Sequence, residues 1–135
     1  MGSDATRRGL AAAAVLCALV SSSFADENLP AYFDGLRARG LFTVAESYAL
    51  GRLSDAKLEP TLRTDLVVEL SKTLVAHAVL IGPPQDEELW QQARDVLAEA
   101  QTRPELVRGE LIAAQMGITL ATQAAAMRQV AELAP

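Results

Sequence analysis

The most constraining feature of the sequence is a long segment of helical periodicity, residues 60–81, bounded at both ends by prolines. Apolar side chains recur along it every three or four residues, as on one side of an α-helix. Pro60 suits the first turn of a helix, where its missing N–H leaves no bond unmade, and Gly82-Pro83-Pro84 ends the segment. The side expected to be buried consists of Leu62, Leu66, Leu70, Leu74, Ala78 and Ile81. The charged side expected to face away from it consists of Arg63, Asp65, Glu69 and Lys72.

The rest of the chain beyond residue 29 has the same period, and no segment alternates apolar and polar residues as a strand does. The composition is rich in Ala and Leu with only 4% aromatic residues, which favours helix over sheet. Shorter helices are predicted over 30–38 and 41–53, and a fourth follows the acidic residues 86–88. Thr102-Arg103-Pro104-Glu105 matches a capping box, so a last helix is predicted from there to about residue 131, with a break near Gly117 as an alternative. The predicted fold is all-α.

The first 25 residues have the order of features of a secretory signal peptide. Arg7 and Arg8 precede an apolar run over 10–20, and Ser23-Phe24-Ala25 supplies small residues for cleavage after Ala25. The run is too short to span a bilayer comfortably, although an uncleaved N-terminal anchor is the alternative. We therefore predict a signal peptide over 1–25, a linker over 26–29, and an extracytoplasmic location for the domain over 30–135. Cleavage would remove the single cysteine, Cys17, and with it any disulfide or thiol chemistry.

Charge and residue types exclude several classes of function. Removing Asp4, Arg7 and Arg8 leaves 10 basic and 16 acidic residues, a net charge near −6, without a basic tract. Nucleic acid and the membrane surface are therefore not expected as partners beyond the signal peptide itself. The lone histidine, His77, offers one metal ligand where a site needs three or four, and we expect it to be a partly buried structural residue. We predict neither a cofactor or metal nor catalytic residues, so the chain is not expected to be an enzyme.

Two segments combine an aromatic residue with small residues at helical spacing. Gly40, Phe42 and Ala45 begin one of them, and Tyr48 follows within the same helix. The second is clearer, because Trp90, Ala93, Leu97 and Ala100 follow a 3-4-3 spacing and Pro104 comes after them. Small alanines let two antiparallel helices approach closely, and the aromatic ring fills the space beside them. These residues are expected to be buried between paired helices, with Gly40 as the turn within the first pair. The positions expected on the packed side of the second helix are Leu41, Val44, Ala45, Tyr48 and Ala49.

With these segments, the chain resembles tetratricopeptide-like helical-repeat proteins over most of residues 30–135, and looks like the N-terminal part of large exported bacterial repeat proteins. The resemblance implies antiparallel helical hairpins stacked as a short solenoid, with a small helix bundle as the alternative. It also implies an exported module for protein–protein contact or scaffolding. Two other functions stay open: the N-terminal part of a larger envelope enzyme or complex, and a small α-bundle that binds an apolar ligand.

The last predicted helix is apolar on two sides. One side should pack inward, and the other is the candidate interaction stripe, because no later helix in the sequence covers it. We expect the stripe to face solvent and to bind a partner protein, further C-terminal repeats or another copy. The inward side consists of Val107, Leu111, Ala114, Ile118 and Ala121. The candidate interaction stripe consists of Ile112, Met116, Leu120, Met127 and Val130, with Ala124 on the same face.

Overall fold

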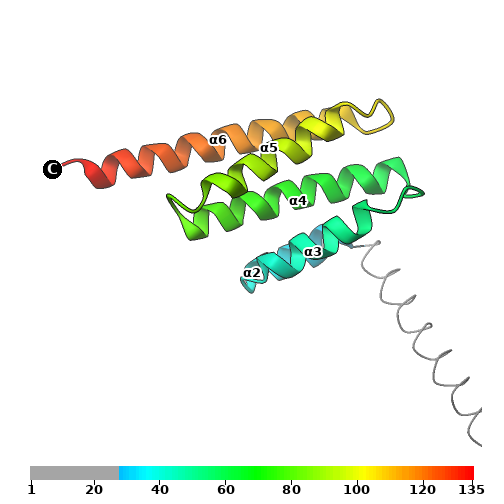
Figure 1. The fold of residues 1–135 in the computed structure, drawn as a ribbon, viewed down its shortest axis with the longest axis horizontal. Coiled ribbons are helices and arrows are strands. Elements are labelled where there is room, and N and C mark those ends of the chain that lie inside the picture. Colours follow the sequence, from blue (N-terminus) through cyan, green and yellow to red (C-terminus); the bar gives the residue numbers. More distant parts are fainter. Residues whose placement is uncertain (1–27) are drawn as a thin grey trace, which may run out of the picture.

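The computed structural model describes residues 28–135, which form five α-helices and no strand. Consecutive helices run in opposite directions along the long axis of the molecule (Figure 1). This arrangement confirms the predicted all-α class. The predicted signal peptide and cleavage site lie outside the described residues. The helices are α2 (Leu29–Ala38), α3 (Phe42–Leu53), α4 (Pro60–Ile81), α5 (Glu87–Gln101) and α6 (Arg108–Leu133).

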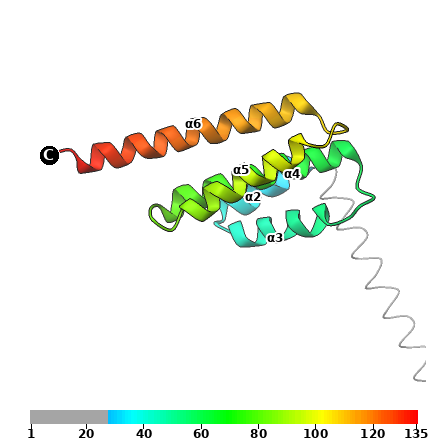
Figure 2. The same ribbon diagram turned by 45° about the horizontal axis from the view of Figure 1, so that its top comes forward.

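The helices form an open arrangement around α4. α4 packs against all four other helices, whereas α6 packs against α4 and α5 and makes at most slight contact with α2 and α3. Figure 2 shows α3 and α6 on opposite sides of the α4–α5 pair, with α2 behind that pair. In a closed bundle the first and last helices would pack together. Each hairpin instead packs on the next, as in a stack with two open ends.

A single apolar core runs between these layers. Phe33, Ala45, Leu66, Ala93 and Leu97 are fully buried. Trp90 and Ala100 are 3% exposed, so the small-and-aromatic spacing of the fourth helix does face its neighbours as predicted. The Trp90 indole N–H donates to Asp86 Oδ2 over 3.0 Å, which gives its polar atom a partner at the start of α5. The largest core contribution comes from α4, because it has neighbours on more sides than any other helix.

The first hairpin, α2 and α3, differs from the predicted one in where α2 begins and in which side chains of α3 are buried. α2 begins at Leu29, and the side chain of Leu29 is 2% exposed, so the linker ends before this residue. Gly40 has a positive φ of 71°, a conformation that favours glycine, and it forms the tight turn to α3 as predicted. Ala45 and Ala49 are buried as expected, but Leu41 and Val44 are 41% and 50% exposed. Only one edge of the predicted stripe faces α2 and α4, because α3 is an outer helix.

The charged side of α4 is not uniformly exposed, contrary to the expectation. Arg63 and Glu69 are 7% and 3% exposed, while Ile81, predicted on the buried side, is 44% exposed. The Arg63 guanidinium donates to the carbonyl oxygens of Leu53 (3.0 Å) and Asp55 (2.6 Å) and so holds the loop that follows α3. Because α4 packs against four other helices, some of its polar residues are buried, and these have hydrogen-bond partners.

The connection between α5 and α6 also corrects the prediction. The capping box at Thr102 is wrong, because Thr102 follows the end of α5 and its hydroxyl donates to the carbonyl oxygen of Glu99 (2.6 Å). α6 begins six residues later, at Arg108, and continues through Gly117 without a break. Val107, expected to pack inward, is 40% exposed. Its backbone N–H donates to Thr64 Oγ1 (3.1 Å), which fixes the loop on α4.

Candidate interaction surface

His77, the lone histidine of the sequence, has structural partners. His77 Nδ1 lies 2.7 Å from Glu46 Oε1, and its ring stacks on Phe42 with 5.2 Å between ring centroids. These contacts join α4 to α3, and the side chain of His77 is 20% exposed. His77 is thus a partly buried residue with a packing role, as expected. Within residues 28–135, no group of three or more His, Cys, Asp or Glu side chains has a geometry that could hold a metal ion.

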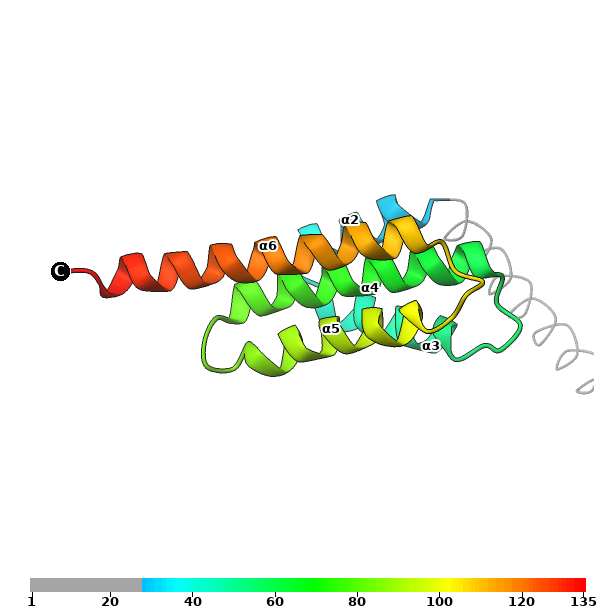
Figure 3. The ribbon, with the colours of Figure 1, turned by 90° about the horizontal axis from the view of Figure 1, so that it is seen from above.

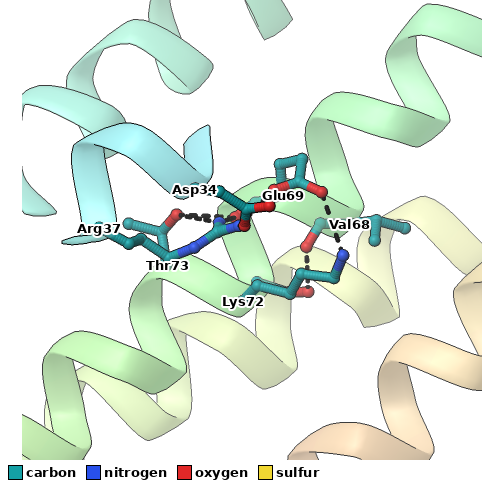
Figure 4. Close-up of polar contacts among 7 residues, drawn as sticks. Asp34, Arg37, Val68, Glu69, Lys72 and Thr73 are labelled. Atoms are coloured by element: carbon teal, nitrogen blue, oxygen red, sulfur yellow. Dashed lines mark hydrogen bonds and ion pairs between the residues drawn. The ribbon is translucent and has the colours of Figure 1, made fainter. Parts of the chain in front are cut away.

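The strongest polar cluster joins α2 to α4 (Figure 4). The Arg37 guanidinium donates to Glu69 Oε2 (2.8 Å), to Thr73 Oγ1 (3.1 Å) and also to Asp34. Lys72 Nζ lies 3.1 Å from the other carboxylate oxygen of Glu69. Every polar atom of the buried carboxylate therefore has a cationic partner, which is the arrangement that a stable buried ion pair needs. This cluster clamps α2 onto α4, and sequence periodicity had placed Glu69 in solvent.

The candidate interaction stripe lies on the outer face of α6, turned away from α4 and α5. We call it the outer stripe. On the opposite face, Leu111 and Ile118 are 1% and 3% exposed and pack into the core. The exposed fractions along the outer stripe are 47% for Ile112, 61% for Met116, 64% for Leu120, 73% for Met127 and 69% for Val130. A row of exposed apolar side chains of this length is unusual on a soluble monomer and is typical of an interaction site.

The second half of α6 has little cover on any side. Figure 3 shows that α6 projects past the loop between α4 and α5, so its C-terminal turns stand clear of the other helices. Beyond Ala125, every residue of α6 is exposed. An isolated helical segment shorter than about 12–15 residues is only marginally stable in water. The projecting end of α6 is continuous with the anchored half and needs no nucleation of its own, but packing on another surface would stabilise it further.

A groove of about 610 Å3 separates α2 from α6 over the surface of α4. Its floor is largely apolar, with Val68, Val75 and Ile118 among the residues that line it. Asp65, Glu69 and Glu110 also line it, and Asp65 lies near both glutamates. Burial raises the pKa of Asp65 above its ordinary value, the charge of Glu69 adds to the rise, and a hydrogen bond with Glu110 opposes it. Lys72 also lines the groove and pairs with Glu69, so this part of the groove carries charges of both signs.

Neither the fold nor known proteins supply a further identification. Within residues 28–135, none of the helices combines the length and apolar character that crossing a bilayer requires. Comparison of the chain with protein-family models, with curated proteins and with solved structures gives no match. The helical-repeat resemblance therefore depends on residue spacing and on the open stacking of the hairpins.

Proposed function

We propose that this chain is an exported helical-repeat module that acts through protein–protein contact or as a scaffold, without catalysis of its own. The observation that carries the proposal is the outer stripe: five large apolar side chains, each at least 47% exposed, lie along one helix. The partner that fits such a surface is another α-helix. A row of apolar residues on a straight helix packs best against the ridges of a second helix.

Two further features support this proposal. α6 is the last helix of an open stack, so its outer face is in the position where the next element of a repeat array would pack. Its projecting end also lacks cover, which a docked helix would supply. The signal-like pattern over residues 1–25 supports export, and further C-terminal helices or a separate protein could provide the partner helix.

Site-specific photo-crosslinking in cells that produce the full chain tests the proposal. A benzophenone side chain at position 120 should give a protein adduct, and the same group at position 98, an exposed alanine on α5, should not. Met116→Glu should remove the adduct because it places a charge on the apolar surface. Equal labelling at both positions, or no adduct at position 120, would show that the outer stripe is not an interface.

The groove between α2 and α6 favours a second function, binding of an apolar ligand. Its volume of about 610 Å3 falls within the range of small-molecule sites. Native mass spectrometry of protein purified from its producing cells should then detect a bound small molecule that Val75→Trp displaces. If only the bare protein mass is found, this second function is excluded.

A further inference from the structure

We infer that the helix bound by the outer stripe is α6 of a second copy, paired antiparallel about a two-fold axis near Leu120. This inference depends on the proposed function and names the partner. A two-fold interface requires a surface that is complementary to itself. The outer face of α6 meets this requirement in the sizes of its side chains, in its charges and in the position of its uncovered end.

Side-chain size follows a complementary pattern around Leu120. Met116 lies four residues before Leu120, and the small Ala124 lies four residues after it. Met127 lies seven residues after Leu120, and Ala113 lies seven before it. Both alanines are exposed. In an antiparallel pair each methionine therefore packs beside an alanine of the other copy, an arrangement that lets the helices approach closely.

The charges of α6 are placed for the same pairing. Residues 111–127 contain no charged side chain, and Glu110 and Arg128 stand at the two ends of this segment. They are eighteen residues apart, which is five turns at 3.6 residues per turn, so they project from the same side of the helix. In an antiparallel pair Glu110 of each copy faces Arg128 of the other. A parallel pair would instead bring like charges together, which disfavours that orientation.

The surroundings of Glu110 strengthen the charge argument. Glu110 lines the groove and has a hydrogen bond with Asp65, which lies near Glu69. Asp65 has a raised pKa because it is partly buried beside the charge of Glu69. Glu69 is already paired with Arg37 and Lys72, so Arg128 of a second copy would add its positive charge beside Glu110 and Asp65.

The uncovered end of α6 gains the support that it lacks in a single copy. The pairing places the projecting turns of one α6 along the first half of the other α6. That half is held on α4 and α5 through Leu111 and Ile118. α6 has 26 residues, so the contact would extend over about 39 Å. Each anchored half thus supports the projecting half of the other copy.

Disulfide trapping tests the orientation. The full chain with Cys17→Ala is prepared with Met116→Cys on one batch and Ala124→Cys on a second batch that carries a longer tag. Mild oxidation of the mixture should join the two batches to each other, because the pairing places positions 116 and 124 within disulfide reach. Neither batch should form an appreciable disulfide dimer alone. Efficient disulfides between two copies of Met116→Cys would indicate a parallel pair and overturn the inference.

A charge swap tests the contact between Glu110 and Arg128. In light scattering or sedimentation, the chain should be a dimer, and Arg128→Glu should weaken dimerisation about tenfold or more through repulsion of like charges. Glu110→Arg should weaken it similarly, and the double swap should restore it. Circular dichroism confirms that each variant stays helical. A monomer at every concentration, or no recovery in the double swap, would overturn the inference. If photo-crosslinking at position 120 still yields an adduct with a different protein, the proposed function survives that failure.

Discussion

Among the described helices, α4 and α6 are the two longest, with 22 and 26 residues, and their exposed and buried side chains differ in opposite ways. α4 buries charged residues such as Arg63 and Glu69, each with hydrogen-bond partners from another element. α6 exposes apolar residues such as Met116 and Leu120. The contrast shows that position in the stack, more than composition, determines which side chains are buried. A central helix needs hydrogen-bond partners within the protein for its buried polar groups. An outer helix needs a partner surface to bury its apolar side chains.

A matched pair of leucine substitutions tests this contrast most strongly. Leu66→Ala in α4 removes a fully buried side chain and should lower the free energy of unfolding by about 2–5 kcal/mol, the usual cost of a core cavity. Leu120→Ala in α6 removes a side chain that is 64% exposed and should change it by less than about 0.5 kcal/mol at concentrations low enough for the chain to be monomeric. Denaturant unfolding measures both values. Equal losses would mean that the two helices do not differ as described.

The ion-pair cluster gives the next largest effect. Glu69→Ala leaves the Arg37 guanidinium without its carboxylate at the interface between α2 and α4, and should cost about 2–3 kcal/mol. Glu105→Ala, on an exposed residue of the loop before α6, is the control and should have little effect. Unfolding by urea provides the comparison. If Glu69→Ala were as stable as the parent, the clamp would contribute only to specificity.

Overpacking probes the close approach of α5 to its neighbours. Ala93 is fully buried, so Ala93→Leu should destabilise the protein by about 1–3 kcal/mol. Ala98 lies on the exposed side of the same helix, and Ala98→Leu should leave the Tm nearly unchanged. Thermal unfolding followed by circular dichroism distinguishes the two variants. An unchanged Tm for Ala93→Leu would place this position outside the core.

The smallest effect concerns Asp65 at the groove. Its pKa in the folded state is raised, so its ionised form disfavours folding above that pKa, and the penalty disappears as the pH falls through it. Asp65→Asn should therefore raise the Tm near neutral pH, by less than the roughly 4 °C that 1 kcal/mol produces in a domain of this size. The two proteins should have the same Tm below about pH 4. A loss of stability in Asp65→Asn at neutral pH would contradict the direction of this effect.

Periodicity predicted α4 and the packed side of α5 well because the signals there are local. Prolines and glycines fix the ends of α4, and the 3-4-3 spacing from Trp90 to Ala100 places those side chains on one side of α5. The start of α6 was not predictable in this way. Thr102 and Glu105 have the spacing of a capping box, but the hydroxyl of Thr64, far away in sequence, holds the backbone of Val107 just before the helix begins. A contact with a distant residue has no signature in the local pattern.

For the candidate interaction surface, too, some features follow from the sequence and others only from the tertiary structure. The apolar character and helical phase of the outer stripe follow from the sequence, and the exposure of Met116, Leu120 and Met127 agrees with that phase. The groove between α2 and α6 and the clamp at Glu69 could not be found from periodicity. Both depend on which helices lie beside α4, and the period of a helix does not specify its neighbours.

The sequence by itself determined that this chain is helical, roughly where its helices lie, and which side of most helices is apolar, because these properties arise from interactions within a few residues. The tertiary structure alone decided that α4 is central and that α6 lies at one side of the described helices. That placement buries Glu69 beside Arg37, although the sequence predicted an exposed position for it, and leaves Leu120 in solvent as the sequence predicted. The physical reason is that burial depends on the number of neighbours that a helix acquires in the folded protein, and those neighbours come from distant parts of the chain.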